Sequence, residues 1–150
     1  MKWEASLKIW RDTRGIQAQP EDVFEGMIAE ERQEYIDATE AEDWDEQVDA
    51  ICDQVVLTSN HLNFNPDRVD LQERLSDLLK SDLPNLGVVP DLAMKQTLKE
   101  ISSREQDPAQ ATRWQIDGGN ITGEKWQKDR NQDPATLYKA NYDLAKAKRK

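Results

Sequence analysis

Apolar residues recur every three or four positions along the first two thirds of the chain, and this spacing predicts a series of α-helices. The first helix is expected from Met1 to about Arg14. Its apolar stripe contains Trp3, Leu7 and Trp10. Gly15 then offers a C-terminal stop, because glycine readily adopts the left-handed conformation that ends a helix.

A second helix is expected from Pro20 to about Thr39, because proline suits the first helical turn and the acids after it complement the helix dipole. One stripe on this helix changes from apolar to acidic along its length. In order, the stripe contains Phe24, Met27, Ile28, Glu31, Glu34 and Tyr35. Carboxylates therefore continue a face that points towards the core.

Three further helices are predicted before residue 105. Asp43 to Asp45 form a turn and an N-terminal cap, and the third helix runs from there to about Leu62. A fourth helix is expected over about Asp67 to Lys80, and a fifth over Asp91 to about Ser102. The segment from Pro84 to Pro90 separates them.

The remaining third of the chain shows no long helical period. Glycines and an Asp-Pro pair punctuate it, at Gly118-Gly119, Gly123 and Asp133-Pro134. We expect an irregular arm over about residues 105–150, ending in a short helix from Leu137 to Lys150 with a basic tail. The prediction is a single all-α domain: a bundle of about five helices, core about 1–104, with this C-terminal arm.

Composition narrows the partners and the cellular compartment. A net charge of −10 opposes binding to nucleic acid, because neutralising phosphates requires a basic surface. No apolar run approaches the roughly 20 residues that a membrane-spanning helix needs. The N-terminus lacks the apolar segment of a secretion signal, and Cys52 is the single cysteine. We therefore expect a soluble cytoplasmic protein with no membrane or nucleic-acid partner.

Two acidic stripes suggest chemistry. In the second helix, Glu31 and Glu34 are one turn apart on the same face. In the third helix, one stripe contains Glu46, Asp49, Asp53 and Asn60. A short turn joins the two helices, so an antiparallel arrangement brings the stripes face to face.

Inward-facing carboxylates are costly unless a positive charge lies between them. A divalent cation satisfies that requirement. All-oxygen ligands suit magnesium, or manganese, better than zinc, and magnesium recruits substrate phosphates to complete its coordination. Against this stands the common alternative that an E-x-x-E pattern is simply a solvated helix face.

These motifs resemble those of the all-α nucleoside triphosphate pyrophosphohydrolases, the MazG-like group that includes phosphoribosyl-ATP pyrophosphohydrolase-like proteins. Glu31-Arg32-Gln33-Glu34 and Glu46-Gln47-Val48-Asp49 match the family's E-x-x-E and E-x-x-D motifs, and the resemblance centres on Pro20 to Leu62. It implies a helical bundle in which Glu31, Glu34, Glu46 and Asp49 bind Mg²⁺. Glu31 and Glu34 are the implied catalytic residues.

The second motif has an alternative register. In the family, the aspartate is often followed by an apolar run and then by an asparagine seven positions later. Asp53 and Asn60 have this spacing. Ala50 then replaces the family's glutamate. We favour the Glu46/Asp49 register because it keeps both acids, with Asp53 as a further ligand and Asn60 as a substrate contact.

Other residues are weaker candidates for substrate binding. Trp44 lies in the turn between the two acidic helices and is the tryptophan expected nearest the substrate. Phage members of the family often place small polar and basic residues where this chain has Arg104, and the arm around Lys125 and Lys128 is similar only in style to those relatives. These are candidate phosphate contacts, although a solvated surface role is the commoner reading for the lysines. If the protein is encoded by a phage, the expected compartment is the cytoplasm of the host.

The implied reaction is hydrolysis of a nucleoside or deoxynucleoside triphosphate to the monophosphate and pyrophosphate, which controls nucleotide pools. The resemblance also implies a homo-oligomer, a dimer or a tetramer. Two alternatives stay open: a non-catalytic acidic helical interaction protein, and a pyrophosphohydrolase of another diphosphate such as phosphoribosyl-ATP.

Overall fold

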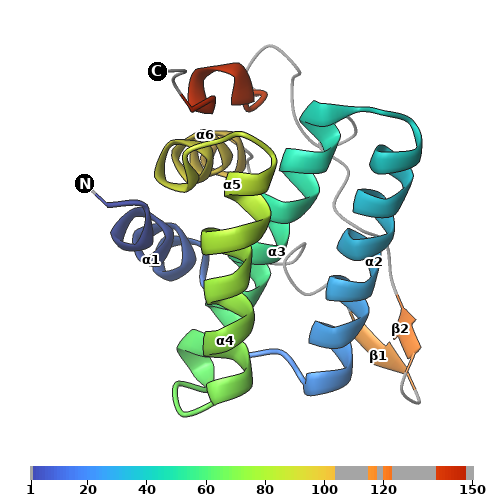
Figure 1. The fold of residues 1–150 in the computed structure, drawn as a ribbon. Helices are drawn as coiled ribbons and strands as arrows, with labels where there is room; N and C mark the ends of the chain where they lie inside the picture. The colour runs from blue at the N-terminus through green and yellow to red at the C-terminus, as the bar shows by residue number, and fades with distance from the viewer. Residues whose placement is uncertain (1, 104–114, 118–119, 123–137, 148–150) are drawn as a thin grey trace.

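The computed structural model describes residues 2–103, 115–117, 120–122 and 138–147 (Figure 1). Within these residues the body of the fold is helical, so the predicted all-α class is confirmed. Five helices form the bundle: α1 (Trp3–Arg14), α2 (Glu21–Glu40), α3 (Trp44–Phe64), α4 (Val69–Asp77) and α6 (Pro90–Ser102).

α1 ends where its sequence predicts. Gly15 has a φ of 62°, and its N–H is directed at the carbonyls of Arg11 and Asp12. A residue with a side chain is strained at this φ, so glycine suits the position.

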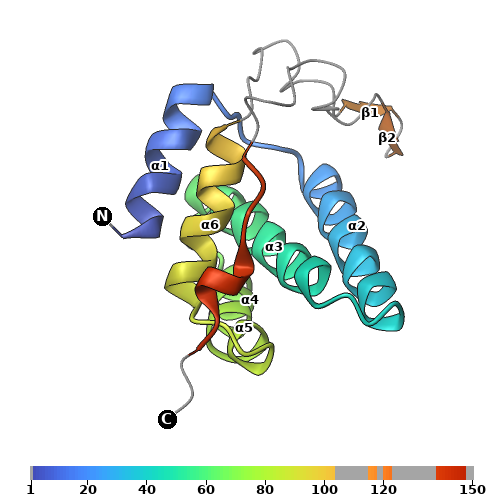
Figure 2. The same ribbon diagram turned by 90° about the horizontal axis from the view of Figure 1, so that it is seen from above.

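α2 and α3 are neighbouring antiparallel helices joined by a short turn (Figures 1 and 2). Asp43 caps α3 as predicted, because its Oδ1 accepts a hydrogen bond from the backbone N–H of Glu46 at 3.2 Å. Glu42 in the turn has a φ of 55°, in the left-handed region. The tight turn fixes which faces of the two helices meet.

The fourth predicted helix is longer than expected. After α4 the chain continues as a π-helical turn, Leu78–Asp82, and then as α5 (Leu83–Asn85). Pro84 was predicted to begin the break, yet it lies within α5. The N–H of Leu83 donates to the carbonyl of Leu78, five residues earlier, which is the π-helical spacing. Pro84 then lies in the first turn of α5, where the missing N–H of proline removes no intrahelical hydrogen bond.

Two apolar clusters form the core. The larger is built around α3 and α6 and includes Leu7, Val55, Met94 and Leu98. The smaller joins α2 to α4 through Phe24, Ile28 and Leu71. α3 contributes to both clusters, so every neighbouring helix is positioned relative to it.

A C-terminal strap, residues 138–147, lies along α6 (Figure 2). Its backbone is held at one end by Val89 N–H to Ala145 O at 2.8 Å and by Ala147 N–H to Gly87 O at 2.8 Å. Buried Gln96 and Glu100 of α6 accept hydrogen bonds from the N–H groups of Asn141 and Ala140. The expected helix over Leu137 to Lys150 was wrong: the strap's helical part is one 3₁₀ turn, Tyr142–Ala145.

Two short strands, β1 (Gln115–Asp117) and β2 (Asn120–Thr122), pair antiparallel in the segment that was expected to be irregular. Ile116 pairs with Ile121, and β2 lies near α2 (Figure 1). Across the described ranges, no helix combines the length and apolar character needed to cross a membrane.

Candidate metal centre

Three carboxylates of α2 and α3 come together at the centre of the helical pair. One oxygen each from Glu31, Glu34 and Asp53 lies within 4.8 Å of the others. Two of these residues come from α2 and one from α3, so the cluster depends on the α2–α3 packing. The predicted meeting of the two acidic stripes is present at these three positions.

The local sequence explains this placement. On α2, the buried Phe24 and Ile28 lead by helical steps to Glu31, whose residue is only 7% exposed. Glu34, one turn further on, is exposed, and Asp53 is half-buried. The cluster therefore extends from the edge of the core to the solvent.

The donor set fits a magnesium ion. Oxygens around an octahedral Mg²⁺ lie about 3 to 4 Å apart, because each metal–oxygen bond is about 2.0–2.1 Å. Small side-chain movements bring oxygens that are within 4.8 Å of one another to that spacing. Carboxylates alone, without histidine or cysteine, are ligands for magnesium or manganese.

Asp49 lies one turn before Asp53 but is engaged by the strap. Its Oδ1 accepts a hydrogen bond from the Tyr142 hydroxyl at 3.1 Å. That hydroxyl also lies 2.9 Å from Thr97 Oγ1 of α6. Burial raises the pKa of the Tyr142 phenol, so the hydroxyl keeps its proton. Asp49 thus links the edge of the acidic cluster to the strap.

Glu46 is exposed in the first turn of α3 and is outside the three-carboxylate group. The register that we favoured from the sequence used Glu46 and Asp49. The oxygens that approach Glu31 and Glu34 belong instead to Asp53, the residue of the alternative register.

Asn60 is held by a residue that the sequence analysis did not single out. Arg11 of α1 donates from Nη1 to Asn60 Oδ1 at 2.9 Å. Arg11 is 7% exposed, and burial lowers the pKa of its guanidinium. A signal was available: Arg11 continues the stripe of Trp3 and Leu7 by a step of four, which places a charged residue on a buried face.

Trp44 has structural partners. Its indole N–H donates to Leu86 O at 2.7 Å, and Lys146 Nζ of the strap lies 4.8 Å from the ring centre. Trp44 is nine residues before Asp53, about 13 Å along a helix axis. The three basic candidates, Arg104, Lys125 and Lys128, lie outside the described residues.

Comparison with known protein families, with curated proteins and with solved structures finds no match to this chain.

Proposed function

We propose that the protein is a magnesium-dependent pyrophosphohydrolase of nucleoside or deoxynucleoside triphosphates. The observation that supports it most directly is the approach of Glu31, Glu34 and Asp53 within 4.8 Å. The resemblance of their motifs to those of the MazG-like enzymes suggests the reaction. In that reaction, water attacks the α-phosphorus of the triphosphate, and pyrophosphate leaves.

In this proposal Glu31, Glu34 and Asp53 hold the metal, whereas Asp49 is kept beside them by Tyr142. Bound magnesium supplies positive charge that compensates the phosphates and lowers the pKa of a coordinated water. Glu34 is the solvent-exposed carboxylate of the three, so it is accessible to an incoming water and is our candidate proton acceptor. Glu31 is buried and fixes the inner side of the site.

We also propose that the active form is a homo-oligomer, a dimer or a tetramer. Ile9 of α1 and Ile36 of α2 are 54% and 48% exposed. Contacts between subunits would remove such apolar surface from water. Size-exclusion chromatography with light scattering tests this: a monomer mass at about micromolar concentration contradicts it.

The decisive experiment is a substrate panel. The purified protein is incubated with each common NTP and dNTP, with and without Mg²⁺, and monophosphate, pyrophosphate and orthophosphate are quantified. Glu34→Gln is compared with Glu30→Gln, which changes an exposed neighbouring glutamate outside the cluster. We expect magnesium-dependent pyrophosphate release that Glu34→Gln abolishes and Glu30→Gln retains.

If folded wild-type protein releases no pyrophosphate from any nucleotide, triphosphate hydrolysis is rejected. Pyrophosphate or monophosphate release from phosphoribosyl-ATP or a nucleotide sugar would then identify another diphosphate as the substrate. Equal loss in both variants would mean that the cluster has no special role.

A further inference from the structure

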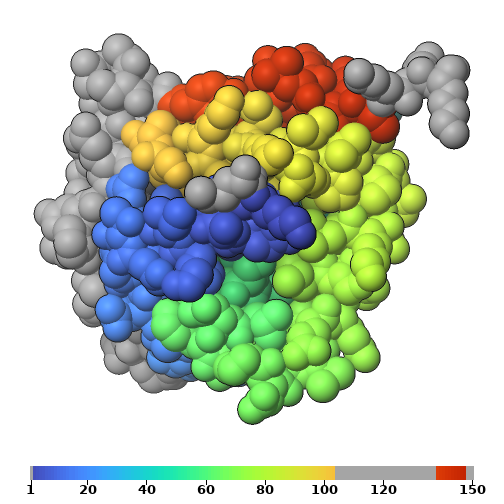
Figure 3. Space-filling model, turned by 90° about the vertical axis from the view of Figure 1, so that its left-hand side faces the viewer, coloured from blue at the N-terminus to red at the C-terminus, as the bar shows by residue number. Residues whose placement is uncertain are grey.

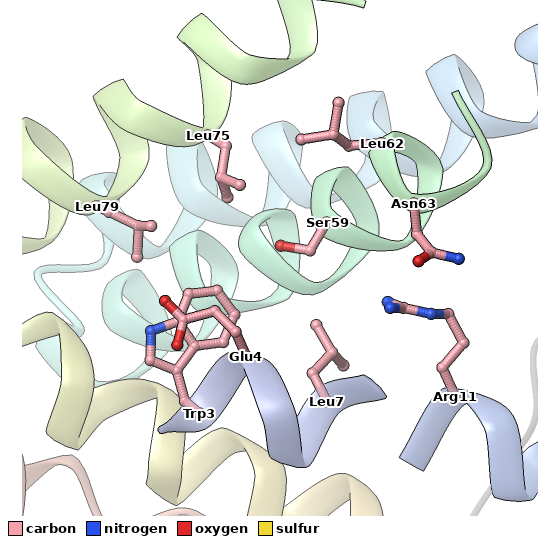
Figure 4. Close-up of a pocket in the computed structure, with 9 residues that line it drawn as sticks. All are labelled: Trp3, Glu4, Leu7, Arg11, Ser59, Leu62, Asn63, Leu75 and Leu79. Carbon is pink, nitrogen blue, oxygen red and sulfur yellow. The ribbon is translucent and has the colours of Figure 1, made fainter. Parts of the chain in front are cut away.

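A pocket on the other side of α3 contains a buried arginine that forms no ion pair within 4 Å among the described residues. The pocket lies between α1, α3 and α4 and has a volume of about 270 Å³. Figure 3 shows this side of the molecule, with a hollow between α1 and α4. Its lining includes Leu7 and Arg11 of α1, Ser59 and Asn63 of α3, Leu75 of α4 and Leu79 of the π-helical turn (Figure 4).

Arg11 is the notable member of this lining. Figure 4 shows its side chain extending from α1 into one end of the pocket, beside Asn63. It is 93% buried, since its exposed fraction is 7%. Among the described residues, its hydrogen-bond partner is the neutral amide of Asn60, and no carboxylate lies within ion-pair distance.

Two buried polar atoms of the lining residues also lack hydrogen-bond partners among the described residues. They are Arg11 Nε and Ser59 Oγ. A guanidinium has five N–H donors, and one neutral acceptor satisfies only part of that capacity. Because burying a charged group is costly unless it is well paired, the free N–H capacity of Arg11 favours an anionic ligand.

We propose that the pocket binds a small organic monoanion: a carboxylate with a compact apolar body. The carboxylate pairs with Arg11, for which a planar guanidinium is the preferred partner. The apolar body lies against Trp3 and the leucines, of which Leu75 and Leu79 line the end away from Arg11 (Figure 4).

Charge and size restrict the ligand. Glu4 also lines the pocket and the chain carries a net charge of −10, so a polyanion is disfavoured where a single arginine supplies the positive charge. A volume of about 270 Å³ is slightly below the usual range for drug-sized ligands, which favours a small compact ligand. The pocket shares no residue with the carboxylate cluster.

The test is a binding titration followed by the backbone amide signals of the ¹⁵N-labelled protein, with sodium octanoate as probe. Octan-1-ol and octylammonium have the same chain without the negative charge. We expect saturable shifts at Leu7, Ser59 and Leu75 with a Kd of about 1 mM or tighter for octanoate. Binding of the other two probes is expected to be at least about tenfold weaker, which is the effect of losing one charge-assisted hydrogen bond.

Arg11→Met removes the charge and keeps the apolar stem, and its matched control is Arg32→Met on the exposed face of α2. Octanoate binding is expected to weaken about tenfold or more in the first and to stay unchanged in the second. Leu79→Trp keeps Arg11 but fills the pocket, so it too is expected to abolish binding. This variant decides the matter if Arg11→Met does not fold.

The proposal is overturned if octanoate and octan-1-ol bind equally, because the arginine would then play no part. It is equally overturned if octanoate shows no saturable shift up to about 10 mM, or if the shifted amides lie away from the pocket. Binding is read without any hydrolysis assay, so failure here leaves the proposed enzymatic function untouched.

Discussion

The two sides of α3 carry side chains of opposite charge. Towards α2, one carboxylate oxygen each of Asp53, Glu31 and Glu34 lies within 4.8 Å of the others. Towards α1 and α4, Ser59 and Asn63 line a pocket whose charged buried residue is Arg11. The carboxylate cluster therefore suits a cation and the buried arginine suits an anion, because opposite charges attract.

The core and the two sites of α3 also differ in how much their side chains contribute to the stability of the fold. The apolar residues of α3 lie in the core between the two sites, whereas the acids and Arg11 lie at its edges. Substitutions in the core should therefore reduce stability, and substitutions at the two sites should mainly change ligand binding.

Ile51→Ala is expected to lower the free energy of unfolding by about 2–5 kcal/mol, because Ile51 is 4% exposed within the larger cluster and its truncation leaves a cavity. Val69→Ala, at a position 60% exposed, should change it by less than about 0.5 kcal/mol. Urea unfolding measures both. Similar losses for the two variants would contradict the assignment of the core.

Magnesium is expected to stabilise the wild-type protein through the carboxylate cluster. Ligand binding to the folded state alone adds about 2.7 kcal/mol at a ligand concentration of 100 times the Kd. Asp53→Asn should remove this effect, while Asp45→Asn, an exposed acid in the first turn of α3, should keep it. Urea unfolding with and without Mg²⁺ is the measurement, and the same magnesium effect in both variants would show that the cation binds elsewhere.

Tyr142→Phe tests the link between the strap and the acidic side of α3. Removing the hydroxyl loses its contacts with Asp49 Oδ1 and Thr97 Oγ1, which should lower the free energy of unfolding by about 1–2 kcal/mol. Tyr138→Phe is a matched control in the strap that leaves the Asp49 contact intact. If Asp49 positions the site, Tyr142→Phe also lowers the hydrolytic rate and Tyr138→Phe does not.

The smallest expected effect is a pH dependence from the N-terminal end of α2. Hydrogen bonds from Arg68, and then from His61, lower the pKa of Glu21 from 4.5 to about 2. Because the folded-state pKa is the lower one, the stability it contributes is present above about pH 4.5 and is lost as the pH falls towards 2.

Glu21 is half exposed, with a side chain 51% accessible, so this contribution is only about 0.5–1 kcal/mol. Glu21→Gln should flatten the stability curve between pH 4.5 and 2 by that amount, as measured by urea unfolding across this pH interval. A curve identical to that of the wild-type protein would contradict the assignment.

The helices were predictable where a local signal marks their ends. Gly15 and Asp43 act as the sequence predicts, since each terminates or caps its helix by contacts within a few residues. The continuation through Pro84 was not predictable from residue type, because it depends on a π-helical turn. The strap was missed for a different reason: its contacts join Tyr142 to residues 45 and 93 positions away.

The candidate site shows the same limit. Helical spacing placed Glu31, Glu34 and Asp53 on facing stripes, but it could not choose between Glu46 and Asp53, because both lie on one stripe of α3. The choice depends on how far α2 is displaced along α3, and helical spacing within one helix does not determine that displacement. Arg11 could be detected from the sequence as a charged residue on an apolar stripe, but its hydrogen bond with Asn60 could not be predicted.

The most direct test of the central claim is the initial rate of magnesium-dependent pyrophosphate release in three variants: Glu34→Gln, Asp53→Asn and Glu46→Gln. The first two change the cluster, and the third changes the exposed acid of the other register. We predict a loss on the order of 100-fold or more in the first two and a change of less than about threefold in the third. Full activity in Asp53→Asn, or its loss in Glu46→Gln alone, would contradict the account.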